Sequence, residues 1–311
     1  MQLKNALLGA NKEPLISTLF IILAYLLSYY ANFFAFHLVF LAFVFVEGLT
    51  SLGFVLWAVL VFVIYGCTTF LPTAPFELPD LSGLDPVAIF LYKVYSQLVN
   101  DTVIQVWEVS AVAIAGLLFS QTRRLSLGLE SIAFMAVLML LLIYDSDGLY
   151  LSNIASQFSV DNAQLSGSTK FDFIDVAVIS SLNAMSIYLY AMFWMGLRLS
   201  AWIHNAYSHY AKQASTLRLS YPYLVMMLIA LAFDYQWIRI LKIPVYLCFL
   251  SILVCFFEVN KFKRTEAILI ALFMSFVIES LIPGVWLIVM GLVLLDCIVN
   301  LRRYMKSVSV F

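Results

Sequence analysis

Apolar residues fill long stretches of the chain, and short polar segments interrupt them. Most of these stretches are close in length to the roughly 20 residues that a helix needs to cross the hydrocarbon core of a bilayer. The pattern predicts an all-α, polytopic transmembrane bundle of about ten spans, or of about eight if one pair is re-entrant. The predicted spans cover 15–30, 32–46, 51–71, 103–120, 126–143, 173–199, 223–235 and 244–258, and two more lie within 264–306.

The last two spans form a hairpin. Two apolar runs flank the turn dipeptide Pro283-Gly284, and basic residues stand on both outer sides of the pair. In the ten-span arrangement, 13 of the 17 Lys and Arg residues lie on the side of the two termini. Because cytoplasmic segments carry the excess of Lys and Arg, we expect both termini in the cytoplasm.

The whole chain, 1–311, is predicted to form a single integral membrane domain with three longer connections. The first, 72–101, is an acidic, proline-containing extracytoplasmic loop. A stretch of it with apolar residues at helical spacing either lies on the outer leaflet as an interfacial helix or packs as a short helix on the bundle. The second connection, 145–172, is a polar extracytoplasmic loop, and the third, 200–221, is a basic, aromatic cytoplasmic loop.

Composition supports the membrane class and argues against several functions. The chain is 64% hydrophobic and 11% charged, whereas soluble domains carry about 25% charged residues. A net charge of −1 gives no basis for nucleic-acid binding. The four cysteines lie in apolar runs without a C-x-x-C pair, and His204 and His209 do not share a helical face. We therefore predict no metal site, no cofactor and, because catalytic motifs are lacking, no enzymatic activity.

Ionisable side chains inside the spans are the candidate binding residues, because a charge in lipid is costly and normally faces the bundle interior or a wet cavity. Glu108, Glu279 and His37 lie at similar depth in the predicted outer third, with Asn183 deeper. They predict an outward-open pocket that binds a small solute. The alternative is structural: the same groups snorkel to the interface or form hydrogen bonds between helices.

A second polar group lies near the end of the chain. Asp296, Asn300 and Arg303 are spaced four and three residues apart, so a continuous helix places them on nearly one face. They predict an inward-facing polar stripe with a structural role. In it, Asp296 pairs with an arginine or an amide on a neighbouring helix.

Three segments resemble the YybS-like family of bacterial polytopic membrane proteins, which has no established activity. They are GLVLLDCIVNLRR (Gly291–Arg303), the connection Trp202–Pro222 that ends in TLRLSYP, and GLLFSQTRRLSLG (Gly116–Gly128). The family is similar to the substrate-binding subunits of energy-coupling-factor importers. The resemblance implies a bacterial inner-membrane location and a subunit that binds a small solute and depends on partners for energy.

The leading hypothesis is a non-enzymatic solute-binding or transport component without its own energy source, surrounded by membrane lipid. The alternative is a structural subunit of a membrane complex. It would dock a membrane protein partner through Trp202, Tyr207 and Tyr210 of the cytoplasmic loop. An intramembrane enzyme is the third hypothesis.

Overall fold

The computed structural model describes residues 13–31, 35–70, 94–96, 98, 101–145, 167–205, 217–232, 238–260, 266–271 and 285–308. All regular structure in these residues is α-helical. The labelled helices are α2 (Pro14–Ala31), α3 (Phe36–Val46), α4 (Thr50–Phe70), α6 (Thr102–Thr122), α7 (Leu125–Asp145), α9 (Gly167–His204), α11 (Tyr221–Ala232), α12 (Ile238–Val259), α14 (Val285–Val299) and α15 (Leu301–Val308).

The all-helical prediction is confirmed for the described residues. Five of their helices, α4, α6, α7, α9 and α12, are long and apolar enough to cross a membrane, and four shorter apolar helices accompany them. The helix ends lie close to the ends of the predicted spans where the sequence contains a clear turn residue. The Glu47-Gly48 break between two spans is a helix end with Gly48 at φ 79°, where Gly48 N–H donates to Phe45 O and Leu49 N–H to Val44 O.

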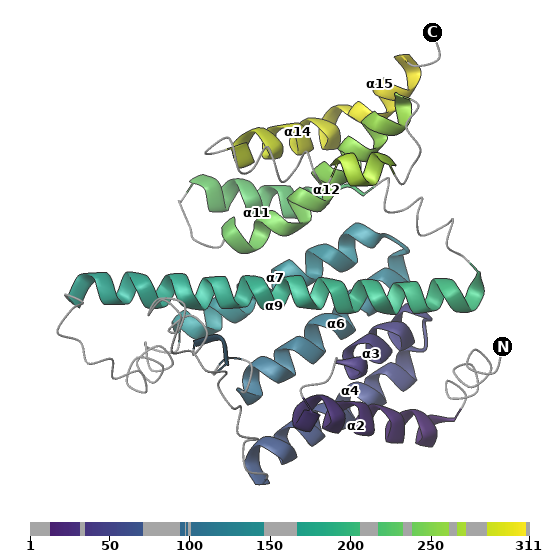
Figure 1. Cartoon of the computed structure of the whole chain (residues 1–311), viewed down its shortest axis with the longest axis vertical. Coiled ribbons are helices and arrows are strands. Elements are labelled where there is room, and N and C mark those ends of the chain that lie inside the picture. The colour runs from purple at the N-terminus through teal and green to yellow at the C-terminus, as the bar shows by residue number, and fades with distance from the viewer. Residues whose placement is uncertain are drawn as a thin grey trace.

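The long helix α9 runs through the middle of the molecule (Figure 1). Helices α2, α3, α4 and α6 lie on one side of it, and α11, α12, α14 and α15 lie on the other (Figure 1). Helix α12 joins the C-terminal helices to the rest of the bundle, because it packs against both α7 and α9. The start of α2 and helix α15 lie at the same end of the bundle as the C-terminal end of α9 (Figure 1).

Helix α3 forms the centre of the N-terminal group. Ten of its eleven residues, His37 to Val46, are buried, because α2, α4, α6 and α9 all pack against it. Glycines permit this close approach: a Cβ on Gly196 of α9 would stand 2.6 Å from the Cβ of Ala42. A Cβ on Gly116 of α6 would likewise stand 2.7 Å from the Cβ of Phe45. Small residues at helix contacts are the usual way in which apolar helices come together in lipid.

One end of the bundle gathers basic side chains, and we call it the basic end. It holds Arg123 and Arg124 between α6 and α7, His204 at the end of α9, and Arg218 and Arg302. The imidazole Nε2 of His204 lies 2.7 Å from Glu47 Oε2, so the C-terminal ends of α3 and α9 are tied together here. At the opposite end, Asp101 caps α6 by accepting hydrogen bonds from the N–H groups of Val103 and Ile104.

Two predicted connections are shorter than expected. Helix α9 begins at Gly167, inside the predicted loop 145–172, and it ends at His204, inside the predicted loop 200–221. Between Leu217 and Ser220 the backbone has no regular structure. Most of the predicted loop 72–101 lies outside the described residues, as do Tyr207 and Tyr210.

Candidate functional site

Helix α3 begins inside the bundle. Eleven residues at about 1.5 Å each give a helix about 16 Å long, roughly half the thickness of a bilayer core of about 30 Å. Its C-terminal end is at the basic end, beside His204, so its first turn lies about 16 Å from that end. Ala35 precedes the helix and provides no side-chain cap. Leu38 N–H and Val39 N–H donate to Ala35 O, so the first two N–H groups of α3 are the ones without a partner within the helix.

Tyr25 of α2 and His37 of α3 meet at this point. Their rings lie edge to face with centroids 5.3 Å apart, and both side chains are buried. The Nδ1 atom of His37 is buried without a hydrogen-bond partner. Because an unsatisfied buried polar atom is costly, this nitrogen is a position at which a bound molecule would gain a hydrogen bond.

Helices α6 and α9 contribute further polar side chains near Tyr25 and His37. The Tyr25 hydroxyl donates to Gln105 Oε1 at 2.8 Å, and Glu108 follows Gln105 by three residues on α6. The Glu108 carboxylate lies within electrostatic range of the hydroxyls of Tyr25 and Tyr188. Tyr188 is in turn hydrogen-bonded to the backbone of Ala35. We call these side chains the central polar cluster: Tyr25, His37, Gln105, Glu108 and Tyr188.

The structure thus groups two of the four residues predicted for a solute pocket. Glu108 and His37 both belong to the central polar cluster. Asn183 has a buried Oδ1 atom without a hydrogen-bond partner, but it lies five residues before Tyr188 on α9, which is about 140° around the helix. It therefore faces a different side of α9. Glu279 lies outside the described residues.

The cluster combines groups that suit a small polar solute. Glu108 is a carboxylate, Tyr25 and Tyr188 carry hydroxyls, Gln105 carries an amide, and His37 has an imidazole. The first turn of α3 adds the partial positive charge of a helix N-terminus.

A second polar site, which we call the basic-end junction, holds the backbone of Leu217 to Ser220 in place. Apart from the Ser220 carbonyl, which accepts from Leu224 N–H at the start of α11, the segment depends on side chains from elsewhere in the chain for its hydrogen bonds. Arg302 Nη2 donates to Leu217 O. Ser220 N–H donates to Glu130 Oε1 at 2.7 Å, and the Ser220 hydroxyl donates to Glu130 Oε2.

Asp296 is the buried anion of the junction, with 1% of its side chain exposed. Its Oδ2 atom lies 2.9 Å from Arg302 Nη2 and 3.7 Å from Arg218 Nε. Arg302 also donates from Nη1 to the hydroxyl of Ser251 on α12 at 2.8 Å. Of the two arginines, Arg302 follows Asp296 by six residues, and Arg218 comes from the segment before α11.

The polar group around Asp296 contains a different arginine from the predicted one. Asn300 has φ 60°, which breaks the helix between α14 and α15. After this break Arg302 is buried and Arg303 is exposed, so Arg302 takes the position beside Asp296 that a continuous helix gives to Arg303. Asn300 stays in the group, because its Oδ1 atom accepts from Arg218 Nη2 and from Arg303 N–H.

Glu130 is a site residue that the sequence argument missed. It is 6% exposed within α7. The sequence does indicate Glu130, because it is a lone carboxylate inside an apolar run. The same pattern made Glu108 a candidate. The roles of Arg218 and Ser220 carry no such signal, since their hydrogen-bond partners Asn300 and Glu130 lie more than fifty residues away in the chain.

The remaining chemistry is sparse in the described part of the chain. No group of three His, Cys, Asp or Glu side chains gathers there as metal ligands, and no disulfide bond links Cys67, Cys248, Cys255 and Cys297. Comparisons of the chain with models of protein families, with curated proteins and with solved structures find no match. The resemblance to the YybS-like family stays a prediction.

Proposed function

We propose that the chain is a multi-pass protein of the bacterial inner membrane, with about ten spans and both termini in the cytoplasm. It acts as a non-enzymatic solute-binding or transport component without its own energy source. The observation that carries this function is the first turn of α3, where buried His37 contacts Tyr25 and Glu108 lies within electrostatic range of Tyr25; we place this turn near mid-depth of the bilayer. Half-membrane helices with such termini form solute sites in transporters.

The cluster also indicates the kind of solute. Glu108 suits a cationic group such as an amine, and the first turn of α3 suits a carboxylate or carbonyl oxygen. The unpartnered Nδ1 atom of His37 adds one further hydrogen-bonding position. A small solute that carries both an amine and an oxygen acceptor fits this combination.

Native mass spectrometry of the full chain, gently extracted from its own membrane, tests the proposal. We expect a retained small molecule, and Glu108→Gln should lower its occupancy about tenfold because a charge-assisted hydrogen bond is lost. Glu130→Gln is the matched control, since it neutralises another buried carboxylate outside the cluster and still leaves an oxygen acceptor for Ser220. Equal retention in wild type and Glu108→Gln would contradict the proposal, as would the absence of any retained molecule.

The alternative, a structural subunit, has one observation in its favour. The connection between α9 and α11 is anchored on both sides: His204 bonds Glu47 before it, and Leu217 O accepts from Arg302 after it. Trp202 is 37% exposed near the first anchor. Such anchoring suits a loop that presents a fixed docking surface. A stoichiometric protein partner that is lost in Trp202→Ala, with no retained solute, would favour this function over the first.

A further inference from the structure

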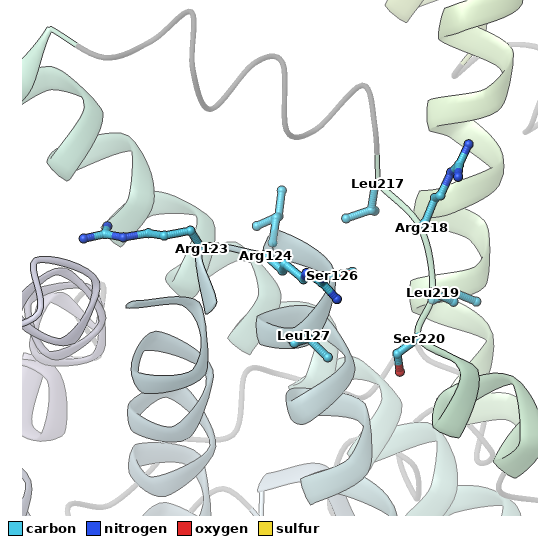
Figure 2. Close-up of a pocket in the computed structure, with 9 residues that line it drawn as sticks. Arg123, Arg124, Ser126, Leu127, Leu217, Arg218, Leu219 and Ser220 are labelled. Carbon is cyan, nitrogen blue, oxygen red and sulfur yellow. The ribbon is translucent and has the colours of Figure 1, made fainter. Parts of the chain in front are cut away.

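A pocket opens at the basic end, between the start of α7 and the segment Leu217 to Ser220. Its volume is about 330 Å³, which is at the lower end of the range for small-molecule sites. Figure 2 shows residues 123–127 on one side and residues 217–220 on the other. The lining consists of three arginines, four leucines and two serines: Arg123, Arg124, Arg218, Leu125, Leu127, Leu217, Leu219, Ser126 and Ser220.

Arg124 is the arginine best placed to receive a ligand. It is exposed, and no acid among the described residues is paired with its guanidinium. Because the backbone of Arg123 is left-handed, at φ 55°, the side chains of Arg123 and Arg124 point in different directions. Figure 2 shows the Arg123 side chain pointing away from residues 217–220, whereas Arg124 lies on the side that faces them.

The charge around the pocket is positive in excess. Among the described residues, Asp296 lies beside both Arg218 and Arg302, so one carboxylate serves two guanidinium groups. Glu130 is occupied by the N–H and hydroxyl of Ser220. Arg124 adds a further charge at the rim. An anion is therefore the ligand that this site favours.

The walls favour an anion with an apolar part. Leu125, Leu217 and Leu219 are buried and form the inner side of the pocket. The N–H groups at the start of α7 also need acceptors, and the arginine before Leu125 has no side-chain acceptor with which to cap them. Guanidinium groups together with a helix start are well suited to phosphate oxygens.

We propose that this pocket binds a phosphate group at the cytoplasmic face of the bundle, supplied by the headgroup of an anionic phospholipid. Basic pockets between transmembrane helices on the cytoplasmic side are where such headgroups bind. The leucines would accommodate the glycerol and the first part of an acyl chain, whereas free phosphate would use the arginines alone. This site is separate from the central polar cluster, which lies near mid-depth.

Titration of the purified full chain in neutral detergent, followed by native mass spectrometry, tests the site. The probes are phosphatidylglycerol, phosphatidylcholine and, in a separate arm, inorganic phosphate. We expect phosphatidylglycerol to be preferred over phosphatidylcholine, and Arg124→Gln to weaken its binding about fivefold. The matched control is Arg303→Gln, which removes the same charge from an exposed residue that does not line the pocket, and it should change binding less than about twofold.

The outcomes separate the two phosphate sources. Strong competition by inorganic phosphate, without any preference among the lipids, would support the phosphate site and assign it to free phosphate. Equal weakening in Arg124→Gln and Arg303→Gln would overturn the pocket, because general surface charge would then explain the binding. Failure of both phosphatidylglycerol and inorganic phosphate to bind would also overturn it. Thermal unfolding of Arg124→Gln should match that of wild type, since the side chain is exposed.

Discussion

The central polar cluster and the basic-end junction are both polar groups inside an apolar bundle, yet they differ in how far their atoms are satisfied. In the junction, Asp296 is paired with Arg302 and lies near Arg218, and both Glu130 oxygens accept hydrogen bonds from Ser220. In the cluster, His37 Nδ1 has no partner, and α3 begins without a side-chain cap. Paired carboxylates stabilise one arrangement of the chain, whereas the His37 nitrogen leaves a position for a bound molecule.

This difference predicts that substitutions in the junction change stability and that substitutions in the cluster change binding. The largest expected effect is that of Arg302→Ala. It leaves Asp296, which is almost fully buried, with the more distant Arg218 as its cationic neighbour among the described residues and with the backbone N–H of residue 302 as a donor. Breaking a buried pair in this way costs about 3–5 kcal/mol. Unfolding of the purified protein in detergent, followed by loss of helical circular dichroism, measures the change in the free energy of unfolding.

Arg303→Ala is the control for this prediction, because Arg303 is exposed and one residue away. It should change the free energy of unfolding by less than about 0.5 kcal/mol. The double variant Asp296→Asn, Arg302→Met should recover much of the loss, since no uncompensated charge is then buried. Equal destabilisation by Arg302→Ala and Arg303→Ala would mean that the buried pair does not hold the junction together.

The second expected effect connects the two regions through packing. In Gly196→Ala, the new methyl group would stand 2.6 Å from the Cβ of Ala42 and 3.0 Å from the backbone nitrogen of Phe43. Because these are core atoms of α3, the two helices must move apart, at a cost of about 1–3 kcal/mol. Displacement of α3 would also shift its N-terminus within the cluster. We therefore expect lower stability and lower occupancy of the retained solute.

Gly291→Ala and Gly66→Ala serve as controls, because a Cβ at either position meets no atom within 4 Å. Both should be neutral or slightly stabilising, since Ala favours a helix over Gly by about 1 kcal/mol. A Gly196→Ala variant as stable as these two would show that α3 and α9 are not in close contact. The cluster would then lose the support that positions α3.

Hydropathy predicted the helices well because lipid requires each apolar run to satisfy its own backbone. The predicted span 51–71 and α4 differ by one residue at each end, for instance. Depth along the helices also brought Glu108 and His37 to the same region. Periodicity failed at Asn300, because a single residue with φ 60° changes which side chain is buried. No local pattern identified the segment Leu217 to Ser220, since distant side chains satisfy its backbone.

The smallest expected effect on stability is that of Tyr25→Phe in the central polar cluster. It removes one hydroxyl and its 2.8 Å hydrogen bond to Gln105 while keeping the ring that contacts His37. A hydrogen bond of this kind contributes about 1 kcal/mol, so the bundle should unfold nearly as wild type does. Occupancy of the retained solute, measured by native mass spectrometry, should fall by several fold because Gln105 loses the partner that orients its amide.

Tyr223→Phe is the matched control, because it also removes a buried hydroxyl, one that donates to Leu241 O at 2.8 Å outside the cluster. Its cost in stability should be similar, and its effect on solute occupancy should be absent. If both variants lowered occupancy equally, the loss would follow general loosening of the bundle and not a contact in the cluster. If Tyr25→Phe destabilised the protein as strongly as Arg302→Ala, the cluster would be a structural network like the junction, and the distinction between the two regions would fail.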